Sequence, residues 1–329
     1  MDMKRIIGSS VILAKTLDHA SQLATINRSV LIVGERGSGK ELFAERLHFL
    51  SSRWDQPFIR VNCAAFSENL LDTELFGHEA GAFTGANKKH PGRFERAEGG
   101  TLFLDELATM SSQLQEKLLR VIEYGEFERV GGSKTIKSDV RVIGATHADL
   151  NNLVSQGSFR ADLLDRLTFD VIQVPSLHER QEDILELSEH FALKICHELN
   201  WSYFPGFTDH AKNTLEGHHW PGNIRELRNA VERSIFRHGD QTSPINQITI
   251  NPFQNQKTET IFHDDNTATH GTATTAVNFN KEVHQFKKSL LMKHLAGNHY
   301  SQKKTASDLM LSYDQIRGLI RKYKLEKIE

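Results

Sequence analysis

The sequence predicts an α/β fold in which a parallel five-stranded sheet lies between helices, followed by an all-helical subdomain and a C-terminal helix-turn-helix. Three observations support this prediction. Apolar runs of strand length alternate with helical stretches, a glycine-rich segment follows the first run, and residues 281–329 form a basic segment with apolar side chains at helical spacing. Alternating strands and helices are typical of a parallel sheet with helices on both faces.

Five short apolar runs are the predicted strands of this sheet. They are Val30–Val33, Phe58–Val61, Thr101–Leu104, Val140–Ala145 and Val171–Val174. Parallel strands that are covered on both faces consist of nearly continuous apolar residues, as these runs do. Residues 1–172 are therefore expected to form one α/β subdomain.

Residues 173–250 are predicted to form a smaller, all-helical subdomain. The helical pattern covers Arg180–Leu199, Thr208–Glu216 and Asn223–His238. Residues 251–280 are rich in Thr, Asn, Gln and His and contain too few apolar residues to build a core. Such a composition predicts a flexible linker.

The C-terminal segment returns to helical periodicity. Helices are expected over Glu282–Ala296, over Gln302–Leu309 and over residues 312–323. Ser312 and Gln315 have the spacing of a capping box, in which each side chain bonds the backbone of the other residue at the start of a helix. A helix, a short helix, a turn and a basic helix follow one another in the helix-turn-helix motif.

The net charge of −2 conceals an asymmetry along the chain. Residues 281–329 carry 11 Lys and Arg against 5 Asp and Glu, a net charge of +6, so the preceding residues carry −8. A basic segment on an acidic body indicates binding to a polyanion, although a solvated basic helix has the same composition.

Composition argues against membrane and disulfide-rich proteins. Hydrophobic residues make up 38% of the chain and charged residues 25%, and no apolar run is long enough to span a membrane. The N-terminus lacks a signal-peptide pattern, and Cys63 and Cys196 have no metal-site or disulfide spacing. These features predict a cytoplasmic protein with two buried, reduced thiols.

The segment after the first predicted strand matches the phosphate-binding pattern G-x-x-x-x-G-K between a strand and a helix. Glycines let successive backbone N–H groups point at phosphate oxygens, and the following helix adds its positive N-terminal dipole. The residues expected to bind nucleotide are Gly34, Glu35, Arg36, Gly37, Ser38, Gly39, Lys40 and Glu41. Lys40 supplies a compact charge for the β- and γ-phosphates. Glu41 stands where Ser or Thr usually ligates Mg²⁺, which leaves an inactive site as the alternative.

Two carboxylates follow the third predicted strand. Asp105 is expected to hold Mg²⁺, and Glu106 to orient the attacking water during ATP hydrolysis. An Asp-Glu pair after a strand is common by chance, but one about 65 residues after a phosphate-binding segment is not. Arg160 and Arg166 could be ordinary surface charges. Alternatively, they could reach the nucleotide site of a neighbouring subunit and supply the positive charge that phosphoryl transfer requires.

A third segment lies between these two halves of the site. It comprises Gly81, Ala82, Phe83, Thr84, Gly85 and Ala86. The flanking glycines free the backbone to project a loop, and an exposed Phe offers a partner an apolar contact. A turn with an incidental Phe would have the same composition, but a simple nucleotidase has no use for such a tip at this position.

Taken together, these segments resemble the bacterial enhancer-binding proteins, the AAA+ activators of sigma-54 (RpoN-type) RNA polymerase. The resemblance covers about residues 6–250 and continues in the tail. Its most specific part is Glu74–Glu79 running into Gly81–Ala86, and Gly92–Glu95, Phe159–Arg166 and Trp220–Leu227 add support. The layout is most similar to the phage shock branch of the family, because the chain begins almost directly at the ATPase domain, without room for a receiver or ligand-sensing module.

The resemblance implies an AAA+ fold with an α/β nucleotide-binding subdomain, a helical lid and a Fis-type DNA-binding domain. It also implies roles for single residues. Asn62 would hold Glu106 and pass the state of the γ-phosphate to the projecting segment. Thr146 would be a sensor, with His147 beside it where the family usually has Asn. Arg225 would be a second sensor in the lid.

The same resemblance places other residues at contacts between molecules. Arg160 and Arg166 match arginine fingers that act on a neighbouring subunit. Gly81–Ala86 matches the loop that touches sigma-54, with Phe83 and Thr84 at its tip. The family also has Glu after the phosphate-loop Lys, which favours an active site despite Glu41.

The last predicted helix offers side chains for DNA. Ile316, Leu319 and Ile320 are expected to form its buried face. Arg and Lys can contact phosphates or guanine edges, and Gln can pair with adenine. The residues left for solvent or DNA are Tyr313, Gln315, Arg317, Arg321 and Lys322. Gly318 is unfavourable inside a helix by about 1 kcal/mol relative to Ala, and the sequence gives no reason for it.

The sequence thus predicts an activator that binds enhancer DNA, hydrolyses ATP with Mg²⁺ as a ring and remodels the closed promoter complex. The expected partners are sigma-54 RNA polymerase holoenzyme, enhancer DNA, other copies of the chain (a dimer off DNA and a hexamer in the ring) and a negative regulator in trans similar to PspA, without membrane insertion. One alternative is a DNA-binding regulator on a vestigial ATPase scaffold, but some relatives of that kind lack the Gly81–Ala86 segment. A second is a helicase or chaperone-type AAA+ enzyme, which the tail and linker disfavour.

Overall fold

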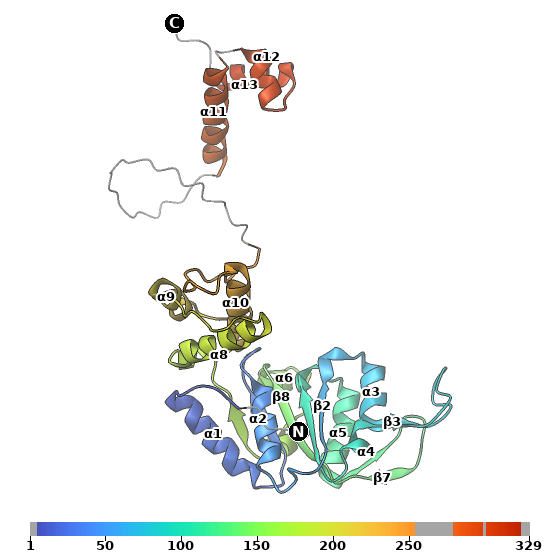
Figure 1. Cartoon of the computed structure of the whole chain (residues 1–329). Helices are drawn as coiled ribbons and strands as arrows, with labels where there is room; N and C mark the ends of the chain where they lie inside the picture. The colour runs from blue at the N-terminus through green and yellow to red at the C-terminus, as the bar shows by residue number, and fades with distance from the viewer. Residues whose placement is uncertain (1–4, 254–278, 299–300, 324–329) are drawn as a thin grey trace. The chain divides into compact units, whose positions relative to one another are not determined.

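The computed structural model describes residues 5–253, 279–298 and 301–323 (Figure 1). The chain divides into two compact units, residues 1–256 and residues 257–329. Most of the predicted linker at 251–280 lies outside the described residues.

A five-stranded sheet forms the centre of the first unit. Its strands are β1 (Val30–Val33), β2 (Phe58–Asn62), β5 (Thr101–Asp105), β8 (Arg141–Thr146) and β9 (Val171–Gln173). They lie in the order β2-β5-β8-β1-β9, and every neighbouring pair is parallel. The prediction of a parallel five-stranded sheet is confirmed.

Helices cover both faces of this sheet (Figure 1). Alternate strand residues face opposite ways, so Ile32, Phe103 and Ile143 pack with α1 (Val11–Ala24) and α2 (Lys40–Phe49). Leu31, Leu102 and Val142 belong instead to the core on the other face. That face is covered by α3 (Glu68–Phe76), α5 (Ser112–Tyr124), α6 (Leu150–Ser155) and α7 (Ala161–Leu167). This is the three-layer arrangement expected for strands buried on both sides.

Two short hairpins lie outside the main sheet. One pairs β3 (Gly77–His78) with β4 (His90–Pro91), and the other pairs β6 (Glu126–Glu128) with β7 (Thr135–Lys137). Around them lie the short helix α4 (Arg93–Arg96) and the 3₁₀ turns η1 (Cys63–Ala65) and η2 (Leu107–Thr109). The segment between β3 and β4 projects from the body of the α/β part (Figure 1).

The helical part of the first unit contains η3 (Leu177–Arg180), α8 (Asp183–Glu198), α9 (Asp209–Gly217) and α10 (Asn223–His238). The helix predicted over Arg180–Leu199 therefore starts three residues later, after a 3₁₀ turn. Buried Trp220 anchors the core of this part, where its indole N–H donates to Leu215 O at 2.8 Å. We refer to residues 177–250 as the lid.

The second unit consists of α11 (Phe279–Gly297), α12 (Gln302–Asp308) and α13 (Tyr313–Tyr323). Its small core contains Leu291, Leu295, Ala306, Ile316 and Ile320. The predicted capping box is present, because Gln315 N donates to Ser312 Oγ at 3.2 Å and Ser312 N donates to Gln315 Oε1 at 2.9 Å. Throughout the described part of the chain, every helix is too short or too polar to cross a membrane.

Candidate active site

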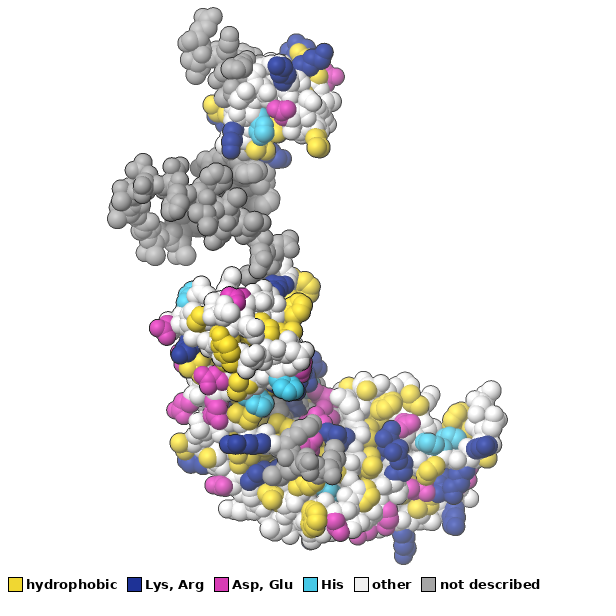
Figure 2. All heavy atoms as spheres, viewed as in Figure 1, with side chains coloured by type: hydrophobic (Ala, Val, Ile, Leu, Met, Phe, Trp, Pro, Cys, Tyr) yellow, Lys and Arg dark blue, Asp and Glu magenta, His cyan; other side chains and the backbone are white. Residues whose placement is uncertain are grey.

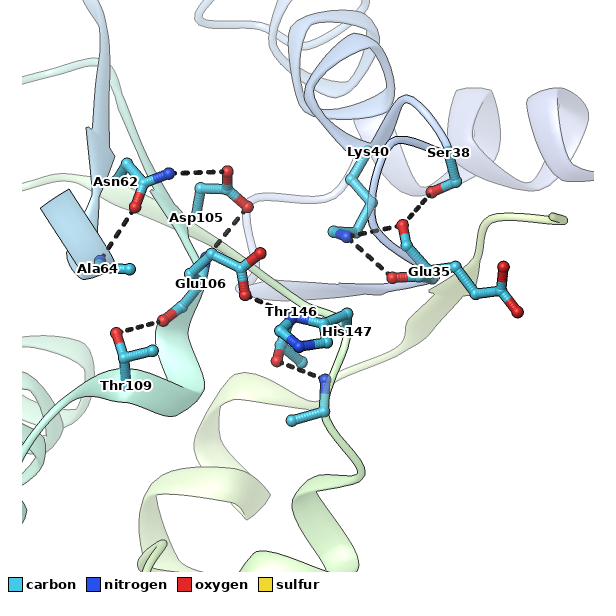
Figure 3. A network of polar contacts seen from close by, with 12 residues as sticks. Glu35, Ser38, Lys40, Asn62, Ala64, Asp105, Glu106, Thr109, Thr146 and His147 are labelled. Atoms are coloured by element: carbon cyan, nitrogen blue, oxygen red, sulfur yellow. Dashed lines mark hydrogen bonds and ion pairs between the residues drawn. The ribbon is translucent and has the colours of Figure 1, made fainter. Parts of the chain in front are cut away.

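The predicted site residues come together because parallel strands place their carboxyl ends at the same edge of the sheet. The phosphate loop (Gly34–Glu41) follows β1, Asn62 ends β2, Asp105 ends β5 and Thr146 ends β8. Figure 3 shows the acidic residues and His147 at this edge, with Lys40 coming from the phosphate loop.

The phosphate loop is held in a fixed shape by close neighbours. Gly37 and Gly39 have left-handed φ values of +75° and +100°, which favour glycine. A Cβ at Gly34 would lie 2.9 Å from Val174 O, and one at Gly37 would lie 2.4 Å from Gly222 O. Two glycines of the loop, Gly34 and Gly37, are thus required by close approach of other backbone segments.

Lys40 begins α2 and is 7% exposed. Its Nζ donates to Gly34 O at 2.8 Å and to Glu35 O at 3.1 Å. Burial lowers the pKa of Lys40, while the nearby charges of Glu106 and Asp105 act in the opposite direction. The ammonium group is therefore partly desolvated and lies close to the two acids.

The two carboxylates have different surroundings. Burial raises the pKa of Asp105, and the adjacent charge of Glu106 raises it further. Glu106 itself has a left-handed φ of +55°, and its N–H donates to Asp105 Oδ1 at 3.0 Å. Left-handed backbone in a residue other than glycine costs about 1–3 kcal/mol and is typical of functional sites.

The partners of Asn62 and Glu106 differ from the expectation. Asn62 Nδ2 donates to Asp105 Oδ2 at 3.5 Å, and Asn62 Oδ1 accepts from Ala64 N at 3.0 Å. The register explains this, because Asn62 lies directly opposite Asp105 in the β2–β5 pair. Glu106 Oε2 instead lies 2.7 Å from His147 Nδ1. An ionised carboxylate only accepts, so His147 is the donor.

The two expected sensors both lie next to the phosphate loop. Thr146 is fully buried at the end of β8, and its Oγ1 accepts from Ala148 N at 3.0 Å. Arg225 comes from α10, and its Cβ would lie 3.1 Å from a Cβ placed at Gly37. Its positive charge lowers the pKa of Lys40, although less than burial does.

Arg160 and Arg166 pair with carboxylates of their own surface. Arg160 Nη2 donates to Asp162 Oδ2 and Arg166 Nη2 donates to Glu123 Oε1, both at 2.7 Å. Both side chains remain substantially exposed, and Arg160 also lines an open cavity of about 560 Å³ formed with α5 and the β6–β7 hairpin. The structure does not bring these arginines to Asp105 and Glu106 of the same chain.

The last residue of the phosphate loop, Glu41, is paired with Arg60, which also donates to Glu45 Oε1 at 3.0 Å.

No cluster of three or more His, Cys, Asp or Glu that could enclose a metal ion occurs among the described residues. Mg²⁺ bound to nucleotide usually takes only one or two protein carboxylates, with phosphates and water completing its shell. Asp105, at the end of a strand beside Lys40, fits that requirement.

The hexapeptide loop (Gly81–Ala86) forms its own tight turn. Gly81 N donates to Ala86 O at 2.7 Å, and Ala86 N donates to Phe83 O at 3.0 Å. Phe83 is 48% exposed and packs edge-on against His78, with ring centroids 4.9 Å apart. An exposed aromatic tip on a short turn is suited to contact with another protein.

A second loop supports the base of this turn, a contact that the sequence did not reveal. Buried Arg129, after β6, forms ion pairs with Glu79 and Glu95. Gly131 approaches Ala82 so closely that a Cβ there would lie 2.7 Å from the Ala82 Cβ. The hexapeptide loop is thus linked to the main body of the α/β part through the β6–β7 hairpin.

The five residues predicted for DNA contact are exposed on α13, as expected for a solvent-facing surface. Lys and Arg side chains are also prominent on the second unit in Figure 2. Of the predicted inward face, Ile316 and Ile320 are buried and Leu319 is partly buried.

Comparison with protein families gives two adjacent matches. The family described as Sigma-54 interaction domain matches residues 6–173, and the family described as AAA+ ATPase lid domain matches residues 178–262. The first match covers the phosphate loop, the hexapeptide loop, Asp105 and Glu106, and both arginines.

Individual relatives agree with these matches. The chain is 53% identical over 320 residues to the Psp operon transcriptional activator of Escherichia coli strain K12, which covers 97% of this chain and 98% of the relative. It is 45% identical over 251 residues to a Nif-specific regulatory protein of Azotobacter vinelandii, covering 76% of this chain and 48% of that relative. The chain thus spans nearly all of the first relative but about half of the second.

Solved structures of one protein are similar to this chain in fold. The crystal structure of NtrX from Brucella abortus in complex with ATP has a TM-score of 0.71 and 30% identity, covering 97% of this chain and 70% of that chain. The ADP complex of NtrX has a TM-score of 0.72 and 30% identity, covering 98% of this chain and 69% of that chain.

Proposed function

The chain belongs to the family of AAA+ transcriptional activators that act with sigma-54 RNA polymerase, and from this premise we propose that ATP hydrolysis moves its hexapeptide loop against sigma-54. It is an ATPase, and its site binds nucleotide. In the proposed cycle, this movement remodels the closed promoter complex to the open one. The single observation that carries the proposal is that one compact unit holds a complete phosphate site and an exposed aromatic loop.

The residues at the sheet edge suit the hydrolysis step. Backbone N–H groups of the phosphate loop and Lys40 would bind the phosphates, and Mg²⁺ held by Asp105 would neutralise charge on the phosphate oxygens. Glu106 would orient a water molecule and accept its proton as the oxygen attacks the γ-phosphorus. The bond to the bridging oxygen then breaks, and ADP departs with that electron pair.

Positive charge at the transferred phosphate is proposed to come from a second copy of the chain. Arg160 and Arg166 are exposed and paired only with surface carboxylates, and exposed ion pairs are weak enough to exchange. In a ring, proposed to be a hexamer that assembles from dimers, these arginines would reach the site of the neighbour. Thr146 and Arg225 would report on the nucleotide in the same ring.

The second unit is proposed to bind enhancer DNA. Its exposed basic helix α13 would enter the major groove, with Tyr313, Gln315, Arg317, Arg321 and Lys322 facing the duplex. The similarity to the Psp operon activator supports a target operon in the phage-shock or envelope-stress response, with a negative regulator similar to PspA acting in trans.

The alternative of a DNA-binding regulator on a vestigial ATPase scaffold is not favoured. The match to the Sigma-54 interaction domain includes both catalytic acids and the hexapeptide loop, and a vestigial scaffold would have no reason to keep them together.

Replacement of Phe83 by Ala tests the coupling between the two sites. Phe83 contributes to no buried core, so we expect ATP turnover within about twofold of wild type. Open-complex formation by sigma-54 holoenzyme is expected to fall at least about 100-fold, because the loop loses its main apolar contact, worth roughly 3 kcal/mol for a buried aromatic at an interface. The measurement is reconstituted transcription on a sigma-54 promoter alongside a phosphate-release assay.

Two controls make the result specific. Phe253→Ala removes another exposed Phe, 89% exposed and outside the loop, and should activate normally. Lys40→Ala should lose both turnover and activation. Normal activation by Phe83→Ala would remove the proposed role of the loop, whereas turnover by Lys40→Ala would remove the assigned nucleotide site.

A further inference from the structure

The lid packs directly on the phosphate loop. Besides the 2.4 Å approach of Gly222 O to the Cβ position of Gly37, Ile224 Cδ1 would lie 3.6 Å from a Cβ at Gly39. These lid residues come from the turn that starts α10, about 185 positions further along the chain. The shape of the loop and the position of the lid are therefore not independent.

Asn223, the first residue of α10, forms the polar part of this contact. Its Nδ2 donates to Glu35 Oε2 at 2.9 Å and to Arg36 O at 3.1 Å. Its Oδ1 accepts from Leu177 N at 2.7 Å. The side chain is fully buried, so this one amide joins the phosphate loop, η3 and α10.

The backbone at this position also favours Asn. Asn223 has a left-handed φ of +53°, a conformation that Asn adopts more readily than most residues with a Cβ. Both the backbone and the side chain therefore select for the same residue type.

Arg180 provides a second contact from the lid. Its Nη2 donates to Ser38 O at 3.0 Å, and the residue is 2% exposed. Burial of an arginine is costly, and its Nε has no hydrogen-bond partner among the described residues. The guanidinium of Arg180 is thus buried at a cost in free energy, and its hydrogen bond goes to the phosphate loop.

These contacts determine where the loop amides point. In a trans peptide the C=O and the following N–H point in opposite directions. Asn223 donates to Arg36 O, so the N–H of Gly37 points away from Asn223. Arg180 donates to Ser38 O, so the N–H of Gly39 points away from Arg180. Neither of these N–H groups donates to a backbone or side-chain acceptor within the described part of the chain, so both are available for phosphate oxygens.

We propose that Asn223 is a positioning residue for ATP, which with Arg180 holds the phosphate loop in its binding shape from the lid. Displacement of the lid then weakens nucleotide binding, and by reciprocity bound nucleotide stabilises one position of the lid. This proposal rests on the ATP hydrolysis assigned to the site. It makes the lid part of the phosphate-binding apparatus through hydrogen bonds from Asn223 and Arg180 to the phosphate loop, separately from Arg225.

The substitution Asn223→Asp separates the contacts. Asp tolerates left-handed backbone and can still accept from Leu177 N, but it cannot donate to Glu35 or Arg36 and adds a charge facing the Glu35 carboxylate. The double variant Glu35→Gln with Asn223→Asp restores a hydrogen bond with donor and acceptor exchanged. Asn229→Ala, at an exposed Asn on the same helix, is the matched control.

The full-length protein is assayed for the Kd of a fluorescent ATP analogue, for KM and kcat, and for its melting temperature without nucleotide. We expect Asn223→Asp to raise Kd and KM about tenfold, the effect of losing a hydrogen bond to a charged group, while kcat changes less than about threefold. The double variant should recover only the part of this loss that comes from the Glu35 contact, because Asp at position 223 still cannot donate to Arg36 O. Asn229→Ala should match wild type. If Asn223→Asp does not fold, Asn223→Gly, which keeps the backbone conformation, is measured in the same way.

Unchanged Kd and KM in a folded Asn223 variant would overturn the proposal. The same conclusion would follow if the melting temperature fell while nucleotide affinity well below melting stayed normal, or if the double variant regained wild-type affinity in full although it lacks the donor to Arg36 O. Absence of turnover in the wild-type protein would instead contradict the assigned function, so the two failures can be told apart.

Discussion

The phosphate loop and the hexapeptide loop each contain two glycines with left-handed backbone, but for different reasons. In the phosphate loop, a Cβ at Gly37 would lie 2.4 Å from a carbonyl oxygen of the lid. In the hexapeptide loop, nothing described lies within 4 Å of a Cβ at Gly81 or Gly85. The glycines of the phosphate loop are enclosed by the lid, whereas Gly81 and Gly85 have open space around them, although Gly131 supports the hexapeptide loop at Ala82. This difference suits the proposed roles of a fixed binding site and a segment that moves against a partner.

The largest difference is expected from Gly37→Ala. The substitution forces a left-handed Ala and a contact with the Gly222 backbone, which together cost about 3 kcal/mol from typical strain and overpacking penalties. We expect ATP binding to be lost and the free energy of unfolding of the first unit to fall by about that amount, measured by urea unfolding and by equilibrium binding of an ATP analogue.

Gly157 provides the matched control for this variant. Its φ of +71° is close to that of Gly37, but nothing lies within 4 Å of its Cβ position. Gly157→Ala should show only the backbone penalty of about 1–2 kcal/mol. Equal losses in the two variants would mean that contact with the lid does not constrain the phosphate loop.

A smaller effect on the enclosed site is expected from His147→Ala. Because His147 contacts Glu106 Oε2 at 2.7 Å, its loss leaves the carboxylate that is proposed to orient water free to rotate. We expect kcat for ATP to fall about tenfold, a typical effect of disturbing a general base, with KM within about twofold. Steady-state ATP turnover measures both.

The variant His147→Asn distinguishes the hydrogen bond to Glu106 from the volume of the His147 side chain. An Asn side chain keeps a donor of shorter reach, so His147→Asn should retain more turnover than His147→Ala. If both variants turn over ATP like wild type, Glu106 is positioned by other groups, and Asn62 becomes the candidate again.

The sequence predicted those parts of the fold that local pattern determines. Buried parallel strands are continuous apolar runs, so all five strands were found, and α10 has the predicted bounds Asn223–His238. The β3–β4 and β6–β7 hairpins were missed, since strands of two or three residues are too short for periodicity to detect.

The site shows the same limit. Asp105, Glu106 and Lys40 were identified from motifs, but their partners depend on contacts between distant segments. His147 meets Glu106 across 41 positions and Asn223 meets Glu35 across 188, distances over which no local pattern carries information. Asn223 lay inside a segment recognised by resemblance, yet only its burial, its left-handed φ and its three hydrogen bonds reveal what it does.

The smallest effect is expected from Gly81→Ala, which tests the free loop as Gly37→Ala tests the enclosed one. The φ of Gly81 is +84°, so Ala disfavours the observed turn by about 1–2 kcal/mol, but its Cβ meets no other atom. Because the loop adds little to the core, the free energy of unfolding and ATP turnover should stay close to wild type. Open-complex formation should fall about tenfold, since a smaller fraction of loops has the competent shape. A loss of unfolding free energy as large as that of Gly37→Ala would show that the hexapeptide loop is held by packing, and the contrast between the two loops would then disappear.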